Sequence, residues 1–186
     1  MKVESFFLIR RICYNRENRK QGSRLGGQKT SQSKNRALLP DNSNCGGFMV
    51  SGTQFTIQTK GLSDIHDITA EVQDIIGKSG IKNGIVTIFA VGSTASVTTI
   101  EFEPALVEDM RDKLEEFAPH SMHSRHSQTW GDDNGFSHIR ATFMGPGLTV
   151  PVSDGTVILG TWQQICVIDH DNRPRSRKIF VQVMGE

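Results

Sequence analysis

The segment WGDDNGFSHIRATFMGPG, residues 130–147, gathers several titratable side chains. Histidine can transfer a proton or bind a metal near neutral pH, and arginine binds carboxylates and phosphates through paired donors. From His138 onward polar and apolar residues alternate, which predicts a strand with His138 and Arg140 on one face and Ile139 in the core. The nearby guanidinium would keep His138 neutral. The pattern fits an active-site wall, or an exposed polar strand after a solvated turn.

Other candidate residues lie elsewhere in the chain. His120, His123 and His126 are spaced by three, which would place them on one helical face, but Pro119 disfavours a helix and favours a solvated loop. Glu101 and Glu103 would share a face if their strand continues. Two carboxylates and two histidines from separate elements can meet at one metal or acid–base site.

A second polar stretch follows Gly160. A glycine within a strand pattern often marks a bulge or a close backbone approach. Trp162 is a candidate core residue, and the amide of Gln163 can donate to and accept from a ligand at once.

Two helices and a series of short strands must position these residues. Apolar residues at helical spacing predict a helix over 68–80 that ends at Gly80, and a second over 103–119 that opens with Pro104. Strand patterns cover 53–59, 84–90, 95–101, 138–144, 148–152, 156–160, 162–169 and 177–184. The region 119–137 is the longest expected loop. This pattern predicts an α+β fold with an antiparallel β-sandwich and two helices.

Residues 1–48 differ in composition from the rest. They hold ten Lys/Arg against three acidic residues, whereas the remainder holds 11 basic and 17 acidic residues. We interpret 1–48 as a disordered basic tail, either a targeting segment or the product of a misassigned start, and 49–186 as one domain. The acidic domain disfavours nucleic-acid binding. No apolar run is long enough to span a membrane, and three scattered cysteines suggest a reducing compartment, so we expect a cytoplasmic protein.

Three longer motifs, GSTASVTTIEFEPALVEDM, WGDDNGFSHIRATFMGPGLTVPVSDG and ILGTWQQICVIDHDNRPRSRKI, resemble the YjbQ family, often described as secondary thiamine-phosphate synthases. The resemblance runs from about Thr53 to Glu186. It implies a YjbQ-like α+β fold built around a β-sandwich and a homotrimer with sites near subunit boundaries. It also implies a weak activity that joins a pyrimidine methyl pyrophosphate to a thiazole phosphate and releases pyrophosphate.

The resemblance also assigns roles to individual positions, residue by residue. Its candidate catalytic residues are Glu101, His126, Asn134, His138 and Gln163, the last within the matched Thr161–Gln163 motif. Its candidate phosphate-binding residues are Arg140, Arg175 and Arg177. A divalent cation, Mg²⁺ or Zn²⁺, would be held by His126, His138 and Glu101. Many members carry histidine where Phe136 stands and serine where Gly147 stands, and some carry histidine at Gly92.

These observations leave three hypotheses. The leading one is an enzyme that acts on a phosphorylated small molecule, with no nucleic-acid or membrane partner. The second is a metal-dependent hydrolase that uses Glu101, His126 and His138 as ligands. The third is a non-catalytic trimeric ligand-binding module.

Overall fold

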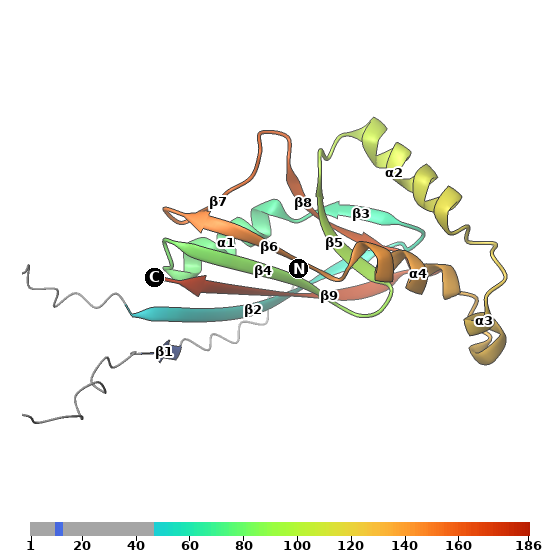
Figure 1. Ribbon diagram of the computed structural model, residues 1–186, viewed down its shortest axis with the longest axis horizontal. Coiled ribbons are helices and arrows are strands. Elements are labelled where there is room, and N and C mark those ends of the chain that lie inside the picture. The colour runs from blue at the N-terminus through green and yellow to red at the C-terminus, as the bar shows by residue number, and fades with distance from the viewer. Residues whose placement is uncertain (1–9, 13–46) are drawn as a thin grey trace, which may run out of the picture.

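The computed structural model describes residues 10–12 and 47–186, and its framework is a six-stranded antiparallel sheet (Figure 1). The strands run in the order β1-β2-β9-β4-β6-β7. Their bounds are β1 Arg10–Ile12, β2 Phe48–Thr59, β4 Gly84–Val91, β6 Gly147–Ser153, β7 Thr156–Val157 and β9 Arg175–Gly185. Apart from β1, the predicted tail of 1–48 lies almost entirely outside the described residues.

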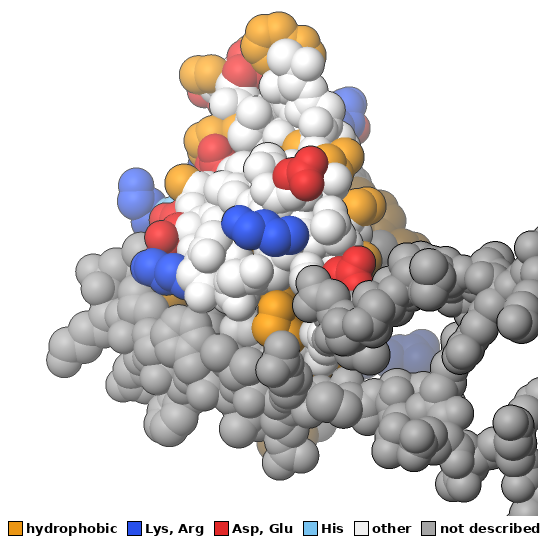
Figure 2. Space-filling view, turned by 90° about the vertical axis from the view of Figure 1, so that its left-hand side faces the viewer, with side chains coloured by type: hydrophobic (Ala, Val, Ile, Leu, Met, Phe, Trp, Pro, Cys, Tyr) orange, Lys and Arg blue, Asp and Glu red, His pale blue; other side chains and the backbone are white. Residues whose placement is uncertain are grey.

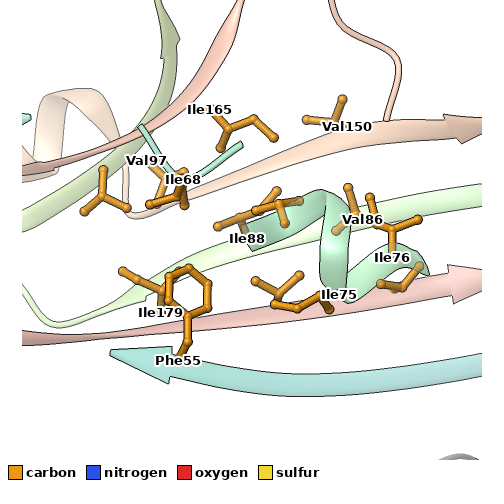
Figure 3. Packing of buried hydrophobic residues seen from close by; sticks show 14 of the residues in the cluster. Phe55, Ile68, Ile75, Ile76, Val86, Ile88, Val97, Val150, Ile165 and Ile179 are labelled. Atoms are coloured by element: carbon orange, nitrogen blue, oxygen red, sulfur yellow. The ribbon is translucent and has the colours of Figure 1, made fainter. Parts of the chain in front are cut away.

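A three-stranded antiparallel sheet, β3-β8-β5, forms the second layer. It comprises β3 Asp64–Asp67, β5 Ala95–Ile100 and β8 Gln164–Asp169. The main core lies between the two sheets and helix α1, Thr69–Ser79, where Phe55, Ile88 and Ile165 belong to one cluster of buried residues with Ile75 and Ile76 of the helix (Figure 3). Successive residues of β8 are buried, because α2 covers the other face of this sheet through Val107 and Leu114. The expected α+β architecture with packed antiparallel sheets is confirmed.

Both predicted helices form, and their ends follow the expected signals. Helix α1 stops at Gly80, which adopts a left-handed conformation (φ 74°) that glycine tolerates without steric cost. Helix α2, Pro104–Phe117, has proline in its first turn and Glu103 as its N-cap, whose carboxylate accepts from the amides of Ala105 and Leu106. Glu103 is therefore committed to a helix cap.

The prediction of only two helices was wrong, because two more form within 119–144. Helix α3, Arg125–Trp130, lies inside the expected loop, with the Ser124 side chain as its N-cap. Helix α4, Gly135–Met144, replaces the strand expected over 138–144. Its buried residues Phe136, Ser137, Arg140 and Ala141 recur at helical spacing, whereas Ile139 is only half-buried. The alternation of polar and apolar residues over 138–144 predicted a strand with Arg140 on its polar face, but the Arg140 side chain lies in the interior.

Some segments differ in smaller ways. β3 forms at 64–67, where no strand was predicted, and only Thr156 and Val157 of the expected strand 156–160 pair. Trp162 is 69% exposed and does not fill the core.

None of the helices in the described ranges combines the length and apolar composition needed to cross a membrane. On the end of the molecule shown in Figure 2, charged side chains of both signs are scattered over the described surface.

Candidate active site

A cleft of about 350 Å³ lies where the β4–β5 loop, the start of β9 and the N-terminal end of α4 converge. Three cationic side chains, Arg175, Arg177 and Lys178, line it against one carboxylate, Asp171. Asn134 and His138 form the α4 side. A second hollow shares Asn134 and Arg175 with the cleft and extends it toward Asp132 and Arg173.

Arg177 is fixed by a buried carboxylate beneath the cleft. Asp169 is fully buried and accepts from Nε of Arg177 at 2.9 Å and also from its Nη2. The same Nη2 donates to Oγ1 of Thr94 at 2.7 Å. Nη1 has no hydrogen-bond partner among the described residues and borders Gly92, where a Cβ would lie 3.2 Å away. A bidentate pair of this kind fixes the guanidinium plane and leaves one edge toward the cleft.

Arg175, two residues earlier in β9, is also held by a buried carboxylate. Its Nε donates to Oδ2 of Asp171 at 2.6 Å, and its terminal nitrogens have no hydrogen-bond partner in the described part of the chain. Burial raises the pKa of Asp171, but hydrogen bonds from Arg175, the Asn172 amide and Thr94 outweigh burial and leave the pKa below its ordinary value. Asp171 therefore stays ionised at neutral pH and holds Arg175 in place.

Gly92 shapes the wall facing Arg177. Its φ of 155° lies in a region that side-chain-bearing residues rarely adopt. Glycine therefore allows the β4–β5 loop to pass close to the guanidinium of Arg177. In this chain a larger residue at position 92 would strain the backbone, and its Cβ would lie 3.2 Å from Nη1 of Arg177.

His138 faces the cleft from α4, with His126 of α3 beside it. The two rings have centroids 4.5 Å apart. Burial lowers the pKa of His138, and the neighbouring His126 lowers it further, against opposing effects of Asp132 and Asp171. His138 is therefore neutral at pH 7. The cause differs from the sequence prediction, which attributed this neutrality to Arg140.

His126 and Asn134 support this side of the cleft through Asp132. Nε2 of His126 is inaccessible to solvent and has no hydrogen bond in the described residues; the nearest oxygen of Asp132 is 3.6 Å away. Asn134 lines the cleft, and its amide nitrogen donates to Asp132 at 3.2 Å when the amide is oriented to satisfy both groups. Asn134 and His138 line the cleft itself, while His126 lies behind His138.

Arg140 does not reach the cleft, contrary to its predicted phosphate-binding role. The side chain is 2% exposed, and its donors bind the Ala118 carbonyl, Glu115 and the Ser63 hydroxyl at 2.6–3.0 Å. These contacts tie α4 to the C-terminal end of α2 and to the segment before β3. The helical conformation of residues 135–144 turns Arg140 inward, away from the strand face that the alternation predicted.

His170 was not among the predicted site residues, and it shares the Ser63 hydroxyl with Arg140. Its ring contacts the hydroxyl of Ser63 at 3.3 Å and that of Ser96 at 3.0 Å, and its carbonyl accepts from Ser137. Burial lowers the pKa of His170 to about 3, with a further contribution from the Arg140 guanidinium. His170 is thus a neutral structural histidine. Its only sequence signal was its position directly after the predicted strand 162–169.

Glu101 and Gln163 lie away from this cleft. Glu101 follows the far end of β5, seven residues beyond Thr94, or about 23 Å along an extended strand. Gln163 is at the same end, since Gln164 pairs with Ile100, and its side chain binds Thr99 and the Gly160 amide. Within one chain the predicted site residues therefore lie in two groups, one at the cleft and the other, Glu101 and Gln163, at the far end of β5.

The predicted metal ligands are not brought together in one chain. Within residues 10–12 and 47–186, no group of three or more His, Cys, Asp or Glu side chains is arranged to hold a metal ion. Glu101 is too distant from His126 and His138 to complete a set. Within one chain the described residues do not assemble the predicted site for a divalent metal, and metal binding stays a prediction.

Two departures from the family pattern do not affect the cleft lining in this chain. Phe136 is 2% exposed and packs against the Arg140 guanidinium, 4.9 Å from ring centroid to Cζ. Gly147 begins β6 opposite Phe89. Neither residue lines the cleft, so neither removes a ligand-binding group from it.

Comparison with known proteins adds a consistent family assignment. The family model described as "UPF0047 protein YjbQ-like" matches residues 53–186. A UPF0047 protein of Methanothermobacter thermautotrophicus is 38% identical over 143 residues, which cover 76% of this chain and 98% of that protein. A Bacillus subtilis relative, also described as a UPF0047 protein, is 32% identical over 69% of this chain and 96% of its own length.

Solved structures agree with the observed fold. A protein from Sulfolobus solfataricus, described as YbjQ-like and of unknown function, superposes with a TM-score of 0.71 at 37% identity. The match covers 75% of this chain and 99% of that one. A hypothetical protein from Aeropyrum pernix gives a TM-score of 0.68 at 29% identity over 73% of this chain and 98% of its own.

Proposed function

The chain belongs to the YjbQ-like UPF0047 family, and from its site geometry we propose that it is an enzyme acting on a small molecule that carries a phosphate or diphosphate. One observation carries the proposal. Arg175 and Arg177 are each held by a carboxylate that is at least 99% buried, and both line the same cleft, where the terminal nitrogens of Arg175 and Nη1 of Arg177 have no partner among the described residues. The free edge of Arg175 suits bidentate binding of phosphate oxygens, and Nη1 of Arg177 adds a further donor.

The reaction we propose is transfer with loss of pyrophosphate, as in thiamine-phosphate synthesis. The carbon–oxygen bond between the pyrimidine methylene and pyrophosphate breaks, and a carbon–nitrogen bond to the thiazole phosphate forms. The departing pyrophosphate takes the bonding electron pair, so negative charge grows on its oxygens. Arg175 and Arg177 stabilise that charge because buried carboxylates already orient them before the bond breaks, and Lys178 adds a third positive charge at the cleft. This stabilisation would be the largest contribution of the protein to the rate.

His138 supplies the second part of the mechanism. It is neutral at pH 7, so it can accept a proton from a reacting group or hydrogen-bond to the pyrimidine ring. His126 lies behind it and helps keep it neutral, and is a positioning residue on this account. Asn134 offers its amide oxygen or nitrogen from the same wall.

We also propose a homotrimer, which would bring the second group of predicted site residues toward a neighbouring cleft. The outer face of the six-stranded sheet supports association, because Ile85, Phe89, Val91 and Phe180 are exposed there at 37–49%. An apolar sheet face of this kind is uncommon on monomers. Glu101 and Gln163 would then act across a subunit boundary, and light scattering that reports a monomer at micromolar concentration would contradict the arrangement.

The proposed function is tested first by binding and then by turnover. Isothermal titration with inorganic pyrophosphate should give saturable binding that Arg175→Met weakens and that Lys82→Met, on a different surface, leaves unchanged. Incubation with pyrimidine methyl pyrophosphate and thiazole phosphate should yield thiamine phosphate. Binding without turnover of this pair would favour the ligand-binding module, and equal binding by both variants would refute the cleft as the phosphate site.

A further inference from the structure

The second hollow beside the cleft has no role in the mechanism described above. Its volume is about 440 Å³, against about 350 Å³ for the cleft, and Asn134 and Arg175 line both spaces. One wall of the second hollow is the link between α3 and α4, with Gly131 and Asp132, and the other is the turn between β8 and β9. The two spaces therefore adjoin at one arginine.

A hydrogen bond between its two walls fixes the shape of the second hollow. Nδ2 of Asn172 donates to the Asp132 carbonyl at 2.7 Å, which holds the β8–β9 turn against the α3–α4 link. The carboxylate of Asp132 is in turn engaged by the Asn134 amide at 3.2 Å, in the orientation that satisfies both groups. The hollow is therefore a space formed before any ligand enters, as ligand sites usually are.

The second hollow carries more positive than negative charge. Arg173 and Arg175 line it against the single carboxylate of Asp132. Arg173 is exposed, and its guanidinium has neither an ion pair nor a hydrogen bond within residues 10–12 and 47–186. A guanidinium that no carboxylate occupies keeps its whole fork of donors for an anion, and phosphate oxygens match that fork.

Arg175 can serve both spaces at once. Its Nε is committed to Oδ2 of Asp171 at 2.6 Å, whereas its two terminal nitrogens keep all of their N–H donors free of partners in the described part of the chain. Asp171 is 1% exposed and anchors the guanidinium from the interior, while the Arg175 side chain is 32% exposed. The anchored group therefore has enough donors to bind one anion in each of the two spaces that it lines.

From the shared Arg175 and the excess of positive charge we propose that the second hollow is a second phosphate subsite, filled while the cleft holds its own phosphate or diphosphate. This inference rests on the proposed function and adds the class of the second ligand, a phosphate group bound through Arg173 and Arg175. Arg175 lies between the two anionic groups and offsets the repulsion between them. In a transfer that releases pyrophosphate, the cleft holds the departing group and the hollow holds the phosphate of the acceptor, so the two reactants are brought together beside Arg175.

Two successive calorimetric titrations of the full chain test the second subsite. Pyrophosphate is titrated first to fill the cleft, and inorganic phosphate is then titrated into the saturated protein, while phosphorus NMR reports any displaced pyrophosphate. About 0.15 M salt largely screens charges farther apart than about 8 Å. Of the two spaces, Arg173→Met changes only the hollow and Lys178→Met only the cleft, and Lys82→Met on a different surface controls for net charge. Arg173 is exposed, so its replacement should leave the Tm unchanged.

We expect one phosphate to bind each pyrophosphate-saturated chain without displacing pyrophosphate. Arg173→Met should weaken phosphate binding about tenfold and leave the pyrophosphate Kd unchanged, Lys178→Met should do the reverse, and Arg175→Met should weaken both. No phosphate binding, phosphate that binds only by displacing pyrophosphate, or equal effects of Arg173→Met and Lys82→Met would overturn the second subsite and leave the cleft proposal intact. Failure of the unmodified chain to bind pyrophosphate would instead refute the proposed function, and the second subsite with it.

Discussion

Replacing Asp169 with asparagine should lower the free energy of unfolding by about 3 kcal/mol. The substitution keeps the size of the side chain and removes its charge. Oδ1 of Asp169 accepts from the Asp171 amide and from Arg177, and Oδ2 accepts from Thr59 and Nε of Arg177. An asparagine must place its NH₂ group at one of these positions, where it faces two donors.

The less costly orientation puts the NH₂ group in place of Oδ2. There the Thr59 hydroxyl can rotate and accept, so only the bond to Nε of Arg177 is lost. A hydrogen bond to a charged group contributes about 1.5–3 kcal/mol, and an unpaired buried charge brings the total cost to about 3–5 kcal/mol. Asp171, 3.4 Å from Arg177, offsets part of that charge, which places the expected loss near the lower limit.

Urea denaturation at pH 7 measures this loss. With a slope of about 2 kcal/mol per molar urea, the midpoint should fall by roughly 1.5 M. Asp154→Asn, at an exposed turn with φ 51° that asparagine tolerates, is the matched control and should change stability by less than about 0.5 kcal/mol. Adding Arg177→Met to Asp169→Asn should recover part of the loss, because the unpaired guanidinium is then removed. A loss below about 1 kcal/mol for Asp169→Asn would refute the reasoning.

Three further predictions concern the cleft and its support. Arg175→Met should weaken pyrophosphate binding by about 10–100-fold in calorimetry, since it removes a charged hydrogen-bond donor, and an unchanged Kd would contradict this. His138→Ala should abolish turnover while its melting curve indicates a stability loss of about 1 kcal/mol or less, because the side chain is only half-buried; unfolding would show a structural role instead. The pKa of His170 is about 3 in the folded protein and near 6.5 in the unfolded chain. Above pH 6.5 the residue is neutral in both states, so its contribution to stability is fully present there. As pH falls from 6 to 4, stability should decline by about 1.4 kcal/mol per pH unit through this residue, and His170→Gln should reduce that slope in denaturant titrations; an equal slope would refute the assignment.

Much of the framework was predictable because its signals are local. Gly80 ends α1 where a left-handed residue is needed, and Pro104 with Glu103 starts α2. The strands of the larger sheet follow their alternation, as in β9, where every second residue is buried. The family resemblance predicted Arg175 and Arg177 as phosphate-binding residues; both line the cleft, and phosphate binding itself stays a prediction.

Residues 135–144 show why the rest needed the tertiary structure. Their sequence alternates like a strand, yet they form a helix because Phe136 and Ala141 pack inward and Arg140 finds acceptors at the C-terminal end of α2, Glu115 and the Ala118 carbonyl. Those acceptors are more than 20 positions away in sequence, and no local pattern reports them. The same holds for His170, whose two hydroxyl partners come from Ser63 and Ser96. Local propensity sets helices and strands, but the partner of a buried charge is chosen by packing, and packing decides which predicted side chains reach the cleft.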